Sequence, residues 1–354
     1  MSEEIELHVL AESFAEMLGS EWPREKALAH ARGAQGLESA FWDQVVALGW
    51  TALTVPENHG GLGMGSEALA ALHGALGSAA APSPLLGTAL AAELLARAGS
   101  DAQQSEWLAR LADGSCRVAF APIEVPASLV DGEMVSGVAE DLVDAATANT
   151  FFLRAERGGA RGWLIVEQRD AGVAVVPIPI ADTTRTMAKV ALVDTPLRSD
   201  RFVASSPQLD DAILRCACIA IAADALGGGE AALSGTIEYM KIREQFGRRI
   251  GSFQALKHRV ADHQAALVGA RALIDLAVAA SADDEALIAA VSAKQHVTRV
   301  VAEIARDCVQ LHGGVGFTAE YFPHVYLKRA KLNEALFGTR VQLLDRLADL
   351  LVAA

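Results

Sequence analysis

The stretch from 241 to 262, KIREQFGRRIGSFQALKHRVAD, has the residue types that bind an anion. Its basic side chains concentrate positive charge in a chain whose net charge is -14. The FGRRIGSF segment should separate two helices, which places a helix N-terminus with free N–H groups near Ser252. Together these features favour a phosphate-bearing small ligand, with a solvated basic turn as the alternative. The basic residues are Lys241, Arg243, Arg248, Arg249, Lys257 and Arg259, against one acid, Glu244.

A second stretch, CVQLHGGVGFT at 308–318, runs from an apolar helix into the pair Gly313-Gly314. Two glycines without side chains let a backbone or a flat ligand approach closely. The plainer alternative is a helix end followed by a turn.

Three regions must position these stretches. Residues 1–115 are predicted to be helical, with Leu37, Phe41, Val45 and Leu48 on one helical stripe. Residues 116–206 carry short β-branched runs between Gly, Pro and Asp turns, which predicts a small antiparallel sheet or barrel. Residues 207–354 are predicted to form a helical bundle with long helices at 208–245, 254–280, 284–312 and 340–352. The predicted class is therefore α+β and mainly α.

Composition excludes several classes of function. The negative net charge argues against non-specific nucleic-acid binding. The four cysteines form no CxxC pair, which favours reduced, buried thiols. The acidic N-terminus does not have the pattern of a signal peptide, and the apolar run CACIAIAADALGGG is expected to be too short to span a bilayer. A cytoplasmic protein with no membrane or nucleic-acid partner is expected.

The two stretches together, REQFGRRIGSFQALKHRVAD and VQLHGGVGFTAEYFPHVYLKRAKL, resemble the acyl-CoA dehydrogenase family, as does LGWTALTVPENHGGLGMG at 48–65. The resemblance implies a helical, β, helical fold and an FAD-dependent α,β-dehydrogenation of a CoA thioester. It also implies that part of the flavin is held by a neighbouring subunit. The cofactor residues that it implies are Arg243, Gln245, Phe246, Ile250, Gln254, Gln310, Gly313, Gly314 and Thr339.

The catalytic base that the resemblance implies is absent. The common Glu-Gly-Thr motif is Phe337-Gly338-Thr339 here, and the alternative position on the first bundle helix is Ala217. Neither side chain can accept a proton. The resemblance also implies a Trp-Ile-Thr segment that cups the flavin in the middle region, and the corresponding stretch at 118–156 does not contain one. The DTTR stretch at 182–185 is expected to be structural. We expect Phe337 to fill a closed substrate pocket.

Three hypotheses follow from this pattern. The first is the base-less subunit of a heteromeric (α2β2) acyl-CoA dehydrogenase, resembling enzymes for bulky or steroid side-chain thioesters. Such a subunit would share FAD with a catalytic partner in a heterotetramer, and electrons would pass to an electron-transfer flavoprotein or similar acceptor. The second is a self-sufficient homo-oligomer with a relocated base, for which Glu334, Glu230 and Asp224 are weak candidates. The third is a non-enzymatic scaffold that binds a CoA thioester or flavin.

Overall fold

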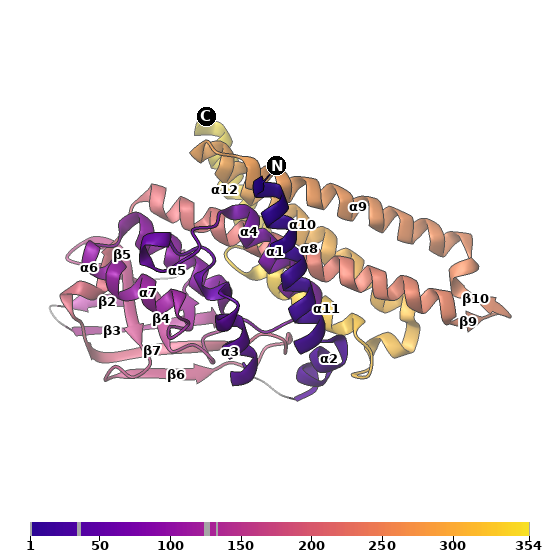
Figure 1. Cartoon of the computed structure of the whole chain (residues 1–354), viewed down its shortest axis with the longest axis horizontal. Coiled ribbons are helices and arrows are strands. Elements are labelled where there is room, and N and C mark those ends of the chain that lie inside the picture. Colours follow the sequence, from indigo (N-terminus) through magenta and orange to yellow (C-terminus); the bar gives the residue numbers. More distant parts are fainter. Residues whose placement is uncertain (1, 34–36, 124–127, 132–133, 354) are drawn as a thin grey trace.

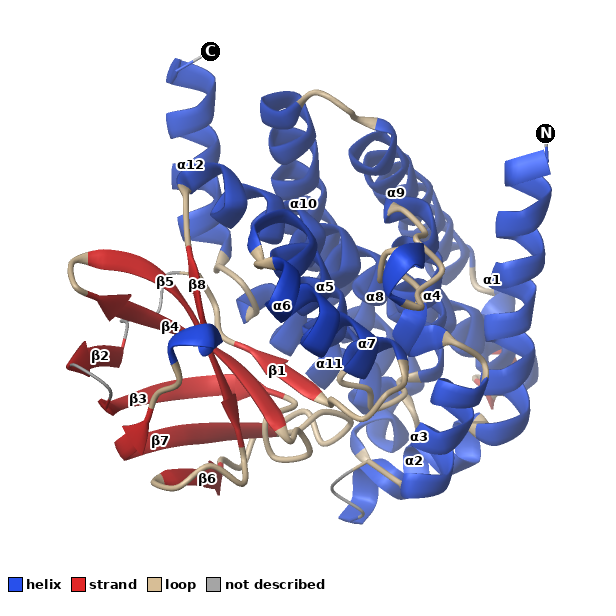
Figure 2. Cartoon of the chain, turned by 60° about the vertical axis from the view of Figure 1, so that its left-hand side comes forward, coloured by secondary structure: helices blue, strands red, loops and turns tan. Residues whose placement is uncertain are grey.

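A computed structural model describes residues 2–33, 37–123, 128–131 and 134–353. Figure 1 shows an N-terminal helical region, a sheet, and long C-terminal helices that extend away from the sheet. Figure 2 shows the strands gathered at one side of the helices, next to α12. This arrangement confirms the predicted mainly helical α+β class with a small sheet domain.

The N-terminal region consists of helices around an aromatic and aliphatic core. Phe41 and Val45 are buried, as the stripe predicts, but Leu48 is 48% exposed. The expectation for Leu48 was wrong because the helix ends at Ala47, so the 3.6-residue period no longer holds one position later. The helices are α1 (Ser2–Glu21), α2 (Arg24–Gly33), α3 (Ser39–Ala47), α4 (Ser66–Ala79), α5 (Leu85–Ala98), α6 (Asp101–Gln103) and α7 (Ala109–Ala112), with short helical turns η1 (Trp50–Ala52), η2 (Glu57–His59) and η3 (Gln104–Leu108).

The middle region forms one sheet with the order β6-β7-β3-β2-β4-β5-β8, and β1 pairs with β4. Most neighbouring strands pair antiparallel, as predicted, but β1 and β2 both run parallel to β4. The β-branched runs of the sequence, RVAFAPI, FFLRAE, GWLIVEQ, GVAVVPIPI and AKVALVD, correspond to β1, β4, β5, β6 and β7. The strands are β1 (Val118–Phe120), β2 (Ser128–Asp131), β3 (Met134–Val143), β4 (Thr150–Arg157), β5 (Ala160–Glu167), β6 (Val173–Pro177), β7 (Met187–Pro196) and β8 (Phe202–Ala204), with the turn η4 (Ser199–Arg201) before β8.

The sequence pattern missed β2, β3 and β8. In β3 the register with β7 shifts between Ala139 and Leu142, and Asp141 has a positive φ of 55°. A bulge of this kind interrupts the alternation of apolar and polar residues on which strand prediction depends. The acidic pair Glu140 and Asp141 adds to the interruption.

The C-terminal region is the predicted helical bundle with one further helix, α11. The predicted first helix ends three residues early, at Ile242, because a tight hairpin of β9 and β10 follows it. The elements are α8 (Pro207–Ile242), β9 (Glu244–Gln245), β10 (Arg248–Arg249), η5 (Ile250–Ser252), α9 (Gln254–Ala279), α10 (Asp283–His312), η6 (Gly313–Phe317), α11 (Pro323–Ala335) and α12 (Arg340–Ala353).

Helix α8 is the central helix of the molecule. It packs so closely on α4 that a Cβ added at Gly77 would lie 1.9 Å from the Asp224 carbonyl oxygen. It is long and apolar enough to cross a membrane, so the sequence argument from length was wrong. However, 78% of its most apolar window is buried inside the protein, as expected of the core helix of a folded domain.

A buried polar network joins the sheet region to the bundle. Arg329 of α11 donates to both carboxylate oxygens of Asp224 at 2.9 and 2.6 Å and to the Thr184 hydroxyl at 2.9 Å. The Thr184 hydroxyl in turn donates to Asp182 at 2.7 Å. Nearby, Arg185 makes a bidentate pair with Asp144. These contacts support the structural role expected for the DTTR stretch.

Candidate functional sites

The first site is a groove of about 760 Å³ at the hairpin end of α8, α9 and α10, which we call the hairpin groove. It joins the two chemistry-bearing stretches of the sequence, which are about 50 residues apart. Its lining residues are Tyr239, Arg243, Gln245, Phe246, Ile250, Phe253, Ala255, Leu256, Arg259, Gln310, Leu311, His312, Gly313, Gly314, Val315 and Thr318.

The hairpin presents an aromatic side chain to solvent. Phe246 and Gly247 both have positive φ, 53° and 76°, as the two central residues of a type I′ turn require. Phe246 is 92% exposed and meets Phe253 edge-on, with ring centroids 6.3 Å apart. Such exposure of a phenylalanine on a left-handed backbone position is costly unless a ligand or partner covers it.

The groove has positive charge that the chain itself does not neutralise. Arg243 caps the end of α8 and is exposed, and among the described residues no carboxylate pairs with it. Arg259, by contrast, pairs with Asp307. Helix α9 begins at Gln254, close to Ser252 as predicted, and no side chain caps it, so its first N–H groups are open to an anion.

The opposite wall is formed by the end of α10. A Cβ added to Gly313 or Gly314 would meet no atom within 4 Å, so the absence of side chains there leaves open space beside the backbone. His312 stacks on Tyr239 with ring centroids 4.2 Å apart, and its Nδ1 lies 2.8 Å from the Cys308 carbonyl oxygen. Its Nε2 is buried and has no hydrogen-bond partner in the part of the chain that the structure describes, and burial lowers the pKa of this imidazole.

The structure brings seven of the nine predicted cofactor residues together in this groove. Gln254 is outside the lining, but its neighbours Phe253 and Ala255 belong to it. Thr339 is elsewhere, at the start of α12, where its N–H and its hydroxyl both lie 2.8 Å from Gln342 Oε1. The seven residues that line the groove are Arg243, Gln245, Phe246, Ile250, Gln310, Gly313 and Gly314.

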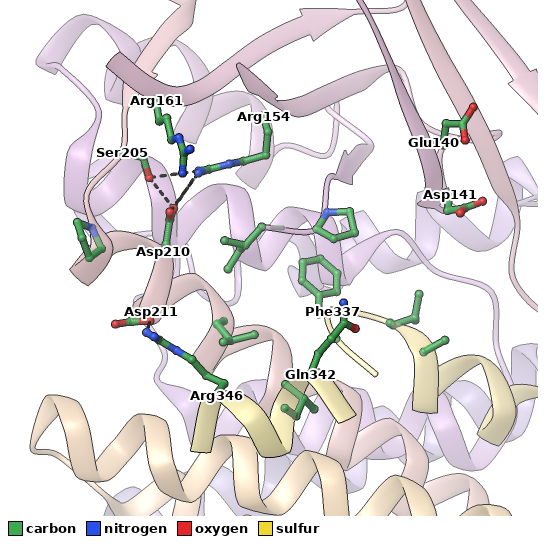
Figure 3. Close-up of a pocket in the computed structure, with 18 of the residues that line it drawn as sticks. Glu140, Asp141, Arg154, Arg161, Ser205, Asp210, Asp211, Phe337, Gln342 and Arg346 are labelled. Atoms are coloured by element: carbon green, nitrogen blue, oxygen red, sulfur yellow. Dashed lines mark hydrogen bonds and ion pairs between the residues drawn. The ribbon is translucent and has the colours of Figure 1, made fainter. Parts of the chain in front are cut away.

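The second site is a cavity of about 1020 Å³ between the sheet and the bundle, which we call the interdomain cavity (Figure 3). Its residues come from the segment after β1, from β3, β4, β5, the β6–β7 connection and β7, and from the β8–α8 connection, α8, α11, the α11–α12 loop and α12. They are Pro122, Ile123, Glu140, Asp141, Arg154, Arg161, Ile180, Met187, Ser205, Ser206, Pro207, Asp210, Asp211, Leu214, Leu332, Ala335, Leu336, Phe337, Gly338, Gln342, Leu343 and Arg346.

Phe337 lines this cavity but does not fill it, so the expectation of a closed pocket was wrong. Its side chain is only 4% exposed and belongs to the largest core cluster, which also contains Ala217 and Leu336. The sequence offered no packing partner for Phe337, and the tertiary structure supplies one. Its φ of 51° is unusual for a bulky residue, and this backbone cost is of order 1–3 kcal/mol.

A buried lysine supports the loop that carries Phe337. Lys294 of α10 is fully buried, and its Nζ donates to the Gly338 carbonyl oxygen at 2.5 Å. Burial lowers the pKa of its ammonium to about 8, and the nearby groups Cys218 and Glu334 offset this only in part. No local sequence pattern indicates this contact, because Lys294 and Gly338 lie on different helix–loop segments.

The carboxylates weighed as substitute bases have other partners. Glu334 pairs with Lys331 at 2.6 Å, and Glu230 pairs with Arg271 at 2.6 Å. Asp224 is held by Arg329 and Asn333, and these contacts hold its pKa below the usual range although burial acts in the opposite direction. Since none of the three carboxylates lines the interdomain cavity, the structure does not favour them as bases there.

The cavity instead has charged residues that sequence reasoning missed. On one side, Arg154 donates to both oxygens of Asp210 at 3.0 and 3.2 Å and to the Ser205 hydroxyl at 3.3 Å. Arg161 lies beside this group, and Glu140 and Asp141 lie on the opposite side (Figure 3). No local motif could have found these residues, because they come from separate strands and from the start of α8.

The two sites lie far apart on one chain. Leu214 is the cavity residue of α8 nearest the groove, and Arg243 ends the helix. At 1.5 Å per residue these positions are roughly 40 Å apart. A single small ligand therefore cannot touch both sites of the same chain.

Family models match both helical regions of this chain. The model of the acyl-CoA dehydrogenase N-terminal domain matches residues 5–115, and that of the C-terminal domain matches residues 212–351. Acyl-CoA dehydrogenase IpdE2 of Mycobacterium tuberculosis is 33% identical over 346 residues, which cover 97% of this chain and 96% of that protein. IpdE2 of Mycolicibacterium smegmatis is 32% identical and covers 98% of both chains.

Solved structures agree with this relationship. The Tcur3481-Tcur3483 steroid ACAD, in a variant form, superposes with a TM-score of 0.88 at 27% identity, covering 99% of this chain and 98% of that one. The ChsE4-ChsE5 complex from Mycobacterium tuberculosis gives a TM-score of 0.87 at 25% identity, with 98% and 97% of the two chains covered.

Proposed function

This chain belongs to the acyl-CoA dehydrogenase family, and we propose that within it the chain is the non-catalytic subunit of a heteromeric, FAD-dependent enzyme. The reaction class is the α,β-dehydrogenation of a CoA thioester. Two of the most similar structures are named as a pair or complex, and one is named a steroid ACAD, which supports a heteromer acting on a bulky, steroid-derived acyl group.

The observation that carries this proposal is the apolar character of both expected base positions. Phe337 and Ala217 are buried in one hydrophobic cluster, where no carboxylate could stay ionised without a partner. The abstraction of a Cα proton needs a placed base beside the thioester. The catalytic glutamate is therefore assigned to a partner subunit.

The hairpin groove fits the phosphate-bearing part of FAD. It combines the exposed guanidinium of Arg243, the uncapped start of α9, the open space at Gly313 and Gly314, and the Nε2 of His312, and among the described residues neither Arg243 nor this Nε2 has a side-chain partner. Arginine suits a pyrophosphate because its planar donors match phosphate oxygens. When bound, FAD would supply the acceptor for the substrate hydride, and Arg243 would neutralise charge on its phosphates.

The distance between the two sites determines which subunit's flavin site the groove can complete. The groove is roughly 40 Å along α8 from the cavity of its own chain. It can therefore complete a flavin site only in a neighbouring subunit. We further propose a cytoplasmic heterotetramer in which electrons leave through an electron-transfer flavoprotein or a similar acceptor.

The test is to compare the chain purified alone with the chain co-expressed with a family member that retains the glutamate. We expect no dehydrogenation from the chain alone, and one FAD per two chains in the complex. Arg243→Gln in this chain should lower the flavin content of the complex, whereas the control Arg198→Gln, at an exposed arginine paired with Asp200, should not. Stoichiometric FAD and turnover in the isolated chain would refute the proposal and favour the self-sufficient enzyme.

Restoring a carboxylate gives a second test. Phe337→Glu should not create a dehydrogenase in the isolated chain, because the hairpin groove still serves a different subunit. Robust turnover by this variant alone would contradict the assignment. Flavin absorbance without turnover in every combination of partners would favour the scaffold hypothesis instead.

A further inference from the structure

We propose that the interdomain cavity of this chain binds a bulky apolar ligand that carries a carboxylate at one end and hydroxyl groups at the other. The ligand class is that of hydroxylated alicyclic carboxylic acids. Binding in this cavity is separate from the role of the hairpin groove. The ligand is bound without being converted, and this part alone rests on the proposed function, which assigns the catalytic base to a partner subunit.

The middle of the cavity is apolar. Ile180 and Met187 come from the sheet region, while Leu214, Leu336 and Phe337 come from the bundle. With a volume of about 1020 Å³, the cavity has room for a rigid hydrocarbon skeleton. Burial of such a skeleton supplies most of the binding free energy.

One end of the cavity has an excess of positive charge. The guanidinium of Arg154 is neutralised by Asp210, and Arg346 is neutralised by Asp211. Arg161 also lines the cavity, and among the described residues no carboxylate pairs with it. The Ser205 hydroxyl bonds Arg154, and its N–H donates to the Arg161 carbonyl oxygen at 2.9 Å, so Ser205 holds the two arginines together. A ligand carboxylate at this end would find a charge-assisted donor.

The other end of the cavity is acidic. Glu140 and Asp141 line it from β3, and no cation pairs with either of them in the part of the chain that the structure describes. Asp141 sits in the bulge with a φ of 55°, a device that re-aims a side chain out of the strand pattern. These carboxylates accept hydrogen bonds and repel anions, so this end selects hydroxyl groups.

The sheet order sets the spacing between the two ends. Strand β3, with the acidic pair, is separated from β5, with Arg161, by β2 and β4. Three interstrand steps of roughly 4.8 Å give about 14 Å across the strands. Through β4 and β2, Arg161 is in register with Ser136 of β3, and Glu140 lies four residues farther along that strand, which adds roughly 13 Å. The two ends are therefore roughly 20 Å apart at the backbone, and a ligand that reaches both must be long and rigid, which excludes short hydroxy acids.

The probe is cholate, used below its micelle-forming concentration, with its methyl ester as the neutral counterpart. Isothermal titration calorimetry on the full chain should show saturable binding of cholate. Arg161→Gln should weaken cholate binding about tenfold and methyl cholate binding by less than about twofold. Asp141→Asn keeps a residue that tolerates the positive φ and should weaken both ligands about threefold.

Two controls keep the test decisive. Arg198→Gln changes an exposed arginine outside the cavity and should leave both affinities unchanged. Leu214→Trp fills the cavity and should abolish binding while the circular dichroism spectrum stays that of the wild type. The proposal is overturned if no probe binds saturably, if Arg161→Gln affects the acid and the ester equally, or if Leu214→Trp leaves binding intact. None of these results depends on flavin content or turnover, which test the proposed function separately.

Discussion

Replacement of Lys294 by Met should measure the free-energy penalty of burying a protonated ammonium group in the fold. The pKa of Lys294 is lowered by burial to about 8, against an unfolded value near 10.5. At about 1.36 kcal/mol per pKa unit, this difference corresponds to about 3 kcal/mol. Below pH 8 both states are protonated, and the full penalty applies to the wild type.

The sign of the pH dependence follows from the same difference. Between pH 8 and 10.5 the folded state loses the proton before the unfolded state does, so the penalty fades and the wild type gains stability relative to Lys294→Met. At pH 7 the variant avoids the penalty but leaves the Gly338 carbonyl oxygen unpaired, which costs about 1–3 kcal/mol. The two proteins should therefore have similar free energies of unfolding at pH 7, and the wild type should be more stable by about 3 kcal/mol near pH 10.5.

Urea unfolding at fixed protein concentration, repeated from pH 7 to 10.5, measures this effect. The four cysteine thiols have pKa values raised by burial, so alkaline pH destabilises the fold through them. That contribution is shared by both proteins and largely cancels in their difference. The matched control is Lys241→Met, an exposed lysine of α8. A stability difference between wild type and Lys294→Met that stays constant with pH would refute the reasoning.

Three further predictions concern stability. Burial lowers the pKa of His73 to about 4, so acidification from pH 6.5 to 4 should lower the free energy of unfolding by about 3 kcal/mol. In urea unfolding, His73→Leu should remove this pH dependence. The same pH dependence in the variant and the wild type would contradict the prediction. Arg329→Met leaves the carboxylate of Asp224 buried without its arginine partner, which should lower the free energy of unfolding by about 3–5 kcal/mol. A loss below about 1 kcal/mol in chemical denaturation would show that the Arg329–Asp224 pair contributes little. Gly77→Ala should destabilise the fold by more than about 2 kcal/mol, because the added Cβ would collide with the backbone of α8. The control Gly269→Ala, where a Cβ has free space, should be neutral or stabilise the fold by up to about 1 kcal/mol. Equal melting temperatures for the two variants would disprove the close packing of α4 on α8.

The hairpin groove was predictable from sequence because each of its walls is a continuous segment. The segment from Arg243 to Ile250 forms one wall, and Gln310 with the two glycines forms the other. Local rules predict the break between α8 and α9 and the end of α10 at Gly313, whereas the choice of Gln245, Ile250 and Gln310 came from the family resemblance and the β9–β10 hairpin was not predicted. Thr339 was assigned by motif alone, and the structure locates it at the other end of the bundle, where it starts α12.

The sequence by itself determined the order of helical and β regions, the positive charge next to the hairpin, and the absence of a carboxylate at Phe337 and Ala217. These are properties of the composition and of the local spacing of apolar residues, and they do not depend on how the helices and strands pack together. Only the tertiary structure decided that Phe337 joins the main core rather than filling a pocket, that Lys294 is buried beneath its loop, and that the arginines and acids of the interdomain cavity meet. The physical reason is that side chains of strands and helices more than 100 residues apart become neighbours through burial of the apolar faces between them, and no short-range pattern records which neighbours result.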